Sequence, residues 1–238
     1  DAAGHGAMLM VDGVSSIGSM PFEFTGWGVD IAVAGSQKGF MLPAGLAILG
    51  VSPKAIAAMD TATLPRTFFD FRDMLTSYAR GGFPYTPPVG LIAGLAHAID
   101  LLEAEGMENV YARHHRLAEG VRRAIKAWGM TPYAATPDLY SDTVTAVKVP
   151  PGCDGTALVQ LAASKYGVAF GVGLGEVAGK VFRIGHLGML TDVMVLSGLA
   201  TAEMCMADLG WPIKLGSGVA AAQDYYRGTV PALAMAAE

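Results

Sequence analysis

Charged residues are scarce in this sequence. They make up only 16% of the 238 residues, the formal net charge is −5, and the longest run of Lys and Arg is the pair at 122 and 123. Proteins that bind nucleic acid or an anionic membrane carry a basic patch on their surface. We therefore expect neither kind of partner.

Cysteines and long apolar runs are also scarce. Cys153 and Cys205 lie far apart, without the spacing of metal ligands and without a secretory leader ahead of them. This pattern predicts a cytoplasmic location and no metal site. The apolar stretches 89–99 and 193–206 are interrupted by polar residues or are shorter than the ~20 residues that span a bilayer. They favour core helices.

Apolar residues, in contrast, are abundant. They make up 52% of the chain, and the mean hydropathy is +0.40. A large, well-filled core would explain this composition, and so would an apolar surface that faces a second copy of the chain. Composition alone does not separate these two explanations.

The first part of the chain reads as an α/β arrangement. Short apolar runs bounded by turn residues predict strands at 7–11, 30–34 and 45–51. Ser52 and Pro53 predict the start of a helix over 54–59, with Ser52 as the N-cap. The run 7–11 has the pattern of a parallel strand buried on both faces. Such a strand needs neighbours, so we expect a further segment before residue 1.

The rest of the chain changes character twice. Residues 61–88 are rich in aromatics and proline without sustained periodicity, which favours a functional loop or an interface. Helical spacing follows over 89–105 and 108–128. Beyond Gly129, strands are predicted at 143–149, 168–172 and 181–184, and helices at 156–166 and 192–209. We therefore expect two domains, 1–128 and 129–238, the second a smaller α+β module.

An acid and an amine follow two successive predicted strands. Asp12 and Lys38 stand 38 − 12 = 26 residues apart, and ligands of open α/β sheets bind at the C-terminal ends of the strands. Pyridoxal phosphate needs a lysine that forms a Schiff base and a carboxylate that keeps the pyridine nitrogen protonated. On spacing alone, a solvated lysine and a turn-capping aspartate are the simpler explanation.

Three longer strings add to this reading. The segments VDGVSSIGSMPF, WGVDIAVAGSQKGFMLPAGLA and VFRIGHLG resemble, in order, the signatures of class V pyridoxal-phosphate aminotransferases of the serine–glyoxylate and alanine–glyoxylate group. The stretches TPDLYSDTVTAVKVP and SGVAAAQDYY are similar to the serine–glyoxylate members. The resemblance implies an α/β fold of the fold-type I class, with part of a large, mostly parallel domain and a small C-terminal domain. It also implies that the segment with the glycine-rich phosphate cup precedes this sequence.

The resemblance implies roles for individual residues. Lys38 would bind the cofactor and then carry the proton between the substrate Cα and the cofactor. Asp12 would pair with the ring nitrogen, and Val14 would pack on one ring face. Gln37 would reach the phosphate or the phenolic oxygen. Arg183 would bind the substrate carboxylate, a task suited to the guanidinium fork, although a strand arginine in a surface salt bridge is the simpler alternative.

A further contact is implied across a dimer. Family members hold the phosphate partly through a Tyr-x-x-Thr stretch of the neighbouring subunit, which appears here as 83–86. Thr86 is kept, and Phe83 stands in place of the tyrosine. That contact is lost or taken over by Tyr85, unless these aromatics serve only as interface packing. His186 follows Arg183 by three residues, and we assign it no role in the site.

The implied reaction transfers an amino group from serine to glyoxylate and yields hydroxypyruvate and glycine. Small amino acids and 2-oxo acids would be the substrates of a homodimer with shared sites. Two alternatives stay open. The donor preference could be for alanine or mixed, and the chain could be a non-catalytic fragment that needs an N-terminal half.

Overall fold

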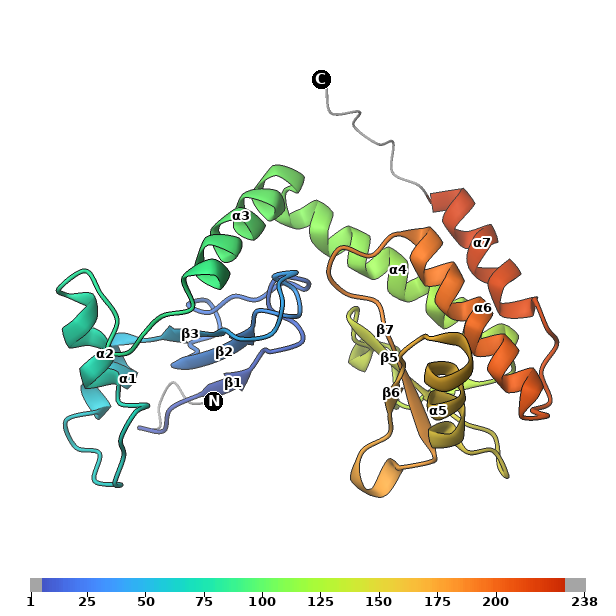
Figure 1. Cartoon of the computed structure of the whole chain (residues 1–238), viewed down its shortest axis with the longest axis horizontal. Coiled ribbons are helices and arrows are strands. Elements are labelled where there is room, and N and C mark those ends of the chain that lie inside the picture. Colours follow the sequence, from blue (N-terminus) through green and yellow to red (C-terminus); the bar gives the residue numbers. More distant parts are fainter. Residues whose placement is uncertain (1–5, 230–238) are drawn as a thin grey trace. The chain divides into compact units, whose positions relative to one another are not determined.

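The computed structural model describes residues 6–229. The chain divides into two compact units between residues 107 and 108, and Figure 1 labels their helices and strands. The boundary predicted near residue 129 concerns the domains of a whole enzyme and stays a prediction.

The first unit contains a three-stranded sheet in the order β1-β2-β3, formed by β1 (Met10–Asp12), β2 (Ile31–Gly35) and β3 (Ala47–Val51). Strand β1 is parallel to β2, with Asp12 opposite Val33, and β3 is antiparallel to β2. The three predicted strands are confirmed, although only one of the two pairings is parallel.

The burial that we expected for the first strand depends on neighbours outside this sequence and stays a prediction. The side chains of Met8, Leu9 and Met10 are exposed, and Met10 retains 64% of its accessible surface. Within residues 6–229, β1 pairs with β2 alone. An apolar run indicates that a strand can be buried, whereas burial itself depends on neighbours that must lie against it.

Helices of the first unit begin at recognisable caps. Ser52 accepts a hydrogen bond from the Ala55 N–H at 3.1 Å at the start of α1 (Pro53–Ala58), as predicted. Asp70 caps α2 (Phe71–Tyr78) in the same way. Helix α2 lies inside the segment that we expected to be irregular. Helix α3 spans Val89–Glu105, as its spacing predicts.

The second unit is an α+β module with a four-stranded antiparallel sheet in the order β4-β5-β7-β6. Its elements are α4 (Met107–Ala127), β4 (Thr131–Pro132), η2 (Pro137–Leu139), β5 (Val144–Lys148), α5 (Gly155–Tyr166), β6 (Gly171–Val172), η3 (Gly175–Val177), β7 (Val181–Gly185), α6 (Asp192–Asp208) and α7 (Ser217–Thr229). The predicted helices and strands of this region are confirmed, whereas β4 and α7 were not anticipated.

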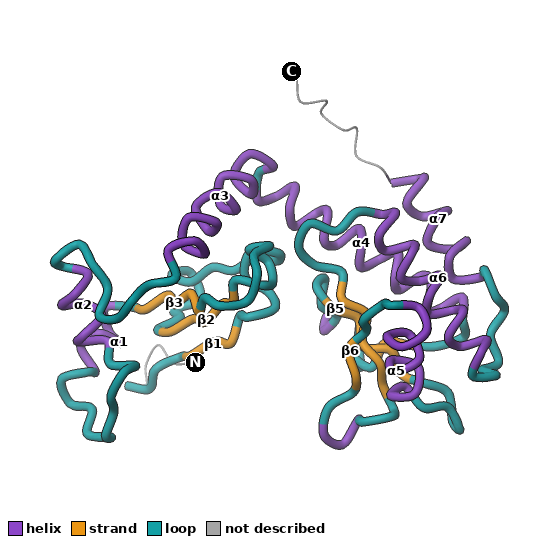
Figure 2. The backbone as a smooth tube through the Cα atoms, in the orientation of Figure 1, coloured by secondary structure: helices purple, strands orange, loops and turns teal. Residues whose placement is uncertain are grey.

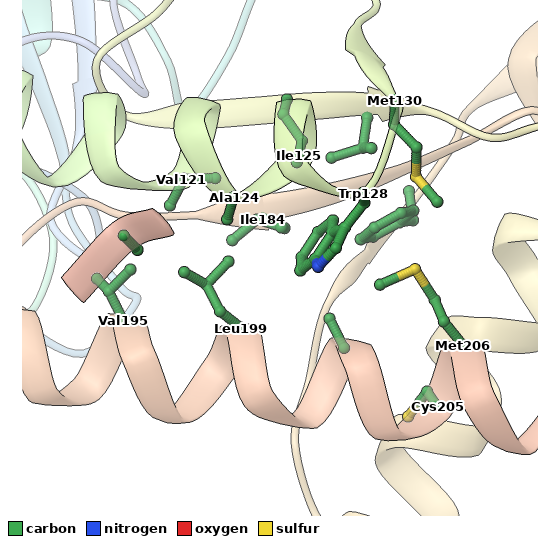
Figure 3. Close-up of a cluster of buried hydrophobic side chains, with 14 of the residues drawn as sticks. Val121, Ala124, Ile125, Trp128, Met130, Ile184, Val195, Leu199, Cys205 and Met206 are labelled. Atoms are coloured by element: carbon green, nitrogen blue, oxygen red, sulfur yellow. The ribbon is translucent and has the colours of Figure 1, made fainter. Parts of the chain in front are cut away.

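The core of the second unit lies on one face of its sheet. Val147 pairs with Phe182, and both are fully buried. Helices α4, α5 and α6 contribute side chains to this core. Figure 3 shows Trp128, the residue after α4, between that helix and Leu199 of α6. The opposite face carries Arg183, which is only half-buried. The alternation of the strands therefore separates the core from a face with Arg183 at its centre.

A buried carboxylate holds the last helix in place. Glu203 of α6 is 2% exposed and accepts hydrogen bonds from the Trp128 indole N–H at 2.8 Å and from the Gly218 N–H at 2.7 Å. The N–H groups of Gly216 and Val219 donate to the same carboxylate. Glu203 thus satisfies donors that the N-terminus of α7 would otherwise leave unpaired.

Candidate cofactor and substrate site

The loops that follow β1 and β2 pack against each other through their backbones. A Cβ atom added to Gly39 would lie 2.3 Å from the Ile17 carbonyl oxygen and 2.8 Å from the Gly18 carbonyl carbon. Only glycine allows this approach. Because β1 and β2 are parallel, both loops leave the same end of the sheet (Figure 2). The structure therefore joins the segment after Asp12 to the segment that carries Lys38.

Two of the predicted cofactor residues lie close to a second glycine, Gly35. A Cβ added to Gly35, the last residue of β2, would lie 2.9 Å from the Gln37 Oε1 and 3.3 Å from the Val14 Cγ1. Val14 and Gln37 come from different loops and meet over this small residue. The sequence-based assignment of both residues to one site fits this arrangement.

Asp12 ends β1 with its side chain exposed. One carboxylate oxygen, Oδ1, accepts a hydrogen bond from the Val14 N–H at 3.0 Å. No donor to Oδ2 is recorded within residues 6–229. The turn-capping role that we considered the simpler explanation is real, yet it occupies only one of the two oxygens. The other can accept a hydrogen bond from a protonated ring nitrogen.

The lysine loop is held by a serine that sequence reasoning missed. Ser36 is fully buried, its hydroxyl donates to the Pro43 carbonyl at 2.8 Å, and the Leu46 N–H donates to the same hydroxyl at 3.1 Å. The Met41 N–H donates to the Lys38 carbonyl at 3.0 Å. Lys38 therefore sits in a fixed turn. The sequence feature that could have identified this contact is the serine of the string GSQKG, two residues before Lys38.

Arg183 lies at the centre of β7 in the second unit. Its Nε–H donates to the Val172 carbonyl at 2.9 Å. Within residues 6–229 no ion pair of Arg183 is recorded, so the surface salt bridge that we considered as an alternative is not formed there. Because Arg183 and Lys38 belong to different units, their convergence on one substrate stays a prediction.

His186 has a structural environment. The imidazole is fully buried, with Nε2 2.8 Å from the Thr145 hydroxyl and Nδ1 3.1 Å from the Asp142 carbonyl. Burial lowers the pKa of His186 to about 4, although the Asp142 carbonyl opposes this shift. A neutral ring that donates from Nδ1 and accepts at Nε2 satisfies both partners.

The segment that follows β7, which includes His186 and Gly188, also contacts helix α4. The Gly188 N–H donates to the His114 Nε2 at 3.0 Å, and the Arg113 guanidinium donates to the Gly188 carbonyl at 2.7 Å. Together with His186, these contacts hold the turn that follows the arginine strand on both sides.

The stretch 83–86 lies between α2 and α3 and is largely exposed. The Tyr85 ring stacks on the Phe68 ring with 4.5 Å between centroids, and Phe83 is 61% exposed. Thr86 is exposed, and no hydrogen bond within the described residues links it to the lysine loop. Its role toward the phosphate of a neighbouring subunit stays a prediction.

The fold and this arrangement define a class of protein. The class-V aminotransferase model matches residues 2–184. The chain belongs to this family.

Individual relatives refine the placement. The chain is 67% identical to an L-aspartate–glyoxylate aminotransferase of Paracoccus denitrificans, over 98% of this chain and 59% of that protein. It is 54% identical to a serine–glyoxylate aminotransferase of Hyphomicrobium methylovorum, over 95% of this chain and 56% of that protein. The crystal structure of pyridoxamine–pyruvate aminotransferase from Mesorhizobium loti superposes with a TM-score of 0.88 at 38% identity, over 95% of this chain and 59% of that one. The chain thus spans less than two thirds of these relatives.

Enzymes of this class depend on pyridoxal phosphate, and the first unit fits that cofactor. Asp12 and Lys38 follow neighbouring parallel strands, and the side chains of Val14 and Gln37 both lie close to Gly35. Among residues 6–229, no cluster of side chains suited to a metal ion is found, and no helix is long and apolar enough to cross a bilayer.

Proposed function

We propose that the protein to which this chain belongs is a pyridoxal-phosphate-dependent aminotransferase that uses glyoxylate as amino acceptor. The observation that carries the proposal is the placement of Asp12 and Lys38 after neighbouring parallel strands whose loops pack backbone to backbone. Relatives named for glyoxylate transamination at 67% and 54% identity support the choice of acceptor.

Each residue of the first unit has a chemical task in this proposal. When bound, the cofactor supplies an electron sink for the charge that develops at the substrate Cα. The Lys38 amine holds the cofactor and then accepts and returns the Cα proton. Asp12 keeps the ring nitrogen protonated through its second carboxylate oxygen. Val14 packs on the ring, and Gln37 donates to an oxygen of the cofactor.

The second unit binds the substrate, and a neighbouring subunit contributes to the cofactor site. Arg183 binds the carboxylate of the amino donor and of glyoxylate in the same pose, since both acids carry this group next to the reacting carbon. Thr86 of a second copy holds the phosphate in a cytoplasmic homodimer. The exposed aromatics at 68, 69, 78 and 83 supply apolar area for such an interface.

Serine is the donor that we propose first, because the strings at 136–150 and 217–226 resemble serine–glyoxylate enzymes. L-Aspartate is the second candidate, favoured by the relative at 67% identity. An aspartate-specific site must pair a second carboxylate. A serine-specific site must form a hydrogen bond with a hydroxyl, and each requirement penalises the wrong donor.

Steady-state kinetics of the enzyme expressed from its complete reading frame test the proposal. We expect amino transfer to glyoxylate, and the ratio of kcat/KM values for serine, aspartate and alanine assigns the donor. Pyruvate and 2-oxoglutarate serve as control acceptors. Activity with these acceptors but not with glyoxylate would contradict the proposed acceptor. The 238-residue chain, assayed beside the complete enzyme, tests whether it is a non-catalytic fragment when alone.

A further inference from the structure

Arg183 is flanked by small residues on both neighbouring strands. Gly171 of β6 and Ala146 of β5 are its Cα partners across the two antiparallel pairings. Directly opposite residues of antiparallel strands share one face of the sheet. The arginine side chain therefore has room to lie across the sheet.

Gly171 makes close contact with that side chain. A Cβ added to Gly171 would lie 2.9 Å from the Arg183 Nε, 3.1 Å from its Cβ and 3.3 Å from its Cζ. The φ angle of Gly171 is not among the positive ones. An L side chain is thus compatible with the backbone here, and the obstacle to one is Arg183 itself. Because Nε and Cζ belong to a flexible side chain, a substituent would displace the guanidinium, whereas the contact with the Arg183 Cβ requires a small shift between the strands.

The neighbouring carbonyl fixes the orientation of the guanidinium. The Nε–H donates to the Val172 carbonyl at 2.9 Å. Within residues 6–229 no acceptor is recorded for either Nη. A guanidinium has two edges that can bind a carboxylate through parallel hydrogen bonds, one with Nε and one Nη, the other with both Nη atoms. The first edge is committed to Val172, and only the second is open.

We infer that Gly171 is a positioning residue for substrate binding: together with the Val172 carbonyl, it holds Arg183 flat across β6, so that substrate carboxylates meet the edge formed by the two Nη atoms. The inference rests on the proposed function, in which Arg183 binds the carboxylate. A side chain at 171 would lift the guanidinium and misalign this edge, while Lys38 and its loop in the first unit would be unaffected.

The first test is Gly171→Ala in the enzyme expressed from its complete reading frame. We expect KM for glyoxylate and for the amino donor to rise about tenfold, the size of a misaligned charge-assisted hydrogen bond, with kcat within about twofold of the wild type. Gly198→Ala in α6 is the matched control, because a Cβ there meets nothing within 4 Å. It should leave both constants unchanged. Unchanged KM values in Gly171→Ala would overturn the inference and leave the proposed function standing.

The second test is a double-mutant cycle with Arg183→Ala, read by the melting temperature. Arg183→Ala removes Nε and Cζ but keeps Cβ, so Gly171→Ala should lower the melting temperature in the wild-type background and less in the Arg183→Ala background. An equal loss in both backgrounds, or failure of both variants to fold, would place the strain elsewhere and overturn the inference. This readout needs no turnover. Absence of glyoxylate transamination in the wild type would refute the proposed function, while the cycle would still decide the contact.

Discussion

The two units hold their functional residues by different means. In the first unit, Lys38 is fixed by backbone contact between glycine-bearing loops and by the Ser36 hydroxyl, and few of the unit's described apolar side chains are buried. In the second unit, Arg183 lies on a strand whose other face belongs to a continuous core of buried side chains. The comparison teaches that the chemistry of the first unit depends on loop geometry, and that of the second on the stability of a core.

Removal of the lysine amine should have the largest effect and should leave the stability of the cofactor-free protein untouched. Lys38→Ala should lower the transamination rate by about a thousandfold or more, the usual range for a lost acid–base group, without a shift in the melting temperature of the cofactor-free protein. Lys54→Ala is the matched control in the same unit, since Lys54 pairs with Asp30 rather than with the lysine loop. Comparable rates for the two variants would break the assignment of Lys38.

A Glu203 variant should show the opposite behaviour, because Glu203 stabilises the second unit and has no role in the proposed reaction. Glu203→Ala removes the carboxylate that accepts from Trp128 and from the start of α7. Leaving these buried donors unpaired should cost about 3 kcal/mol of unfolding free energy for the second unit. Urea titration followed by tryptophan fluorescence measures the loss. The exposed Glu176→Ala should change the free energy by less than about 0.5 kcal/mol, and an equally small effect at 203 would contradict the role of Glu203.

Acid should weaken the second unit through His186. Burial lowers the pKa of His186 to about 4 from its ordinary value of 6.5. Between pH 6.5 and pH 4, the imidazole is therefore protonated in the unfolded chain but neutral in the folded chain. Stability should therefore be fully present above about pH 6.5 and fall as the pH drops toward 4, by up to about 3 kcal/mol.

Urea midpoints recorded across this pH range measure the effect. His186→Asn should flatten the pH dependence, whereas the exposed His97→Asn should preserve it. A curve of His186→Asn that parallels the wild type would assign the acid sensitivity to another group.

Loss of the Ser36 hydroxyl should have the smallest effect. Ser36→Ala removes two hydrogen bonds of the lysine loop and should cost about 1–2 kcal/mol. Because this loop carries Lys38, the affinity for pyridoxal phosphate, measured by absorbance titration, should also fall. Ser15→Ala, which changes a half-buried serine in the loop after β1, is the control. An equal loss of affinity in both variants would show that the clamp at Ser36 is not specific.

The sequence predicts most elements that carry a strong local signal. Helices α3 to α6 have regular apolar spacing, and Ser52 caps α1 as its residue type suggests. Helix α7 was not predicted because its start is stabilised by Glu203, a residue distant in sequence. In addition, Gly218 usually suggests a turn, whereas here it allows close contact with the Trp128 ring. The short helix α2 lies among prolines and aromatics that obscure its two turns.

The residues of the candidate site also differ in whether the sequence predicts them. Asp12, Lys38 and Arg183 are chemically distinctive residues at strand positions, so their residue types and the resemblance suffice to single them out. The contributions of Ser36 and Gly171 arise from contacts across loops and strands, which no local pattern specifies.

The central claim is that Lys38 and Asp12 form the cofactor site of a class V aminotransferase. The most direct measurement is borohydride reduction of the enzyme with pyridoxal phosphate, followed by peptide mass mapping, in the wild type and in Asp12→Asn. The account predicts a pyridoxyl group on Lys38 and weaker cofactor retention in the variant. A pyridoxyl group on another lysine, or none in the complete enzyme, would contradict it.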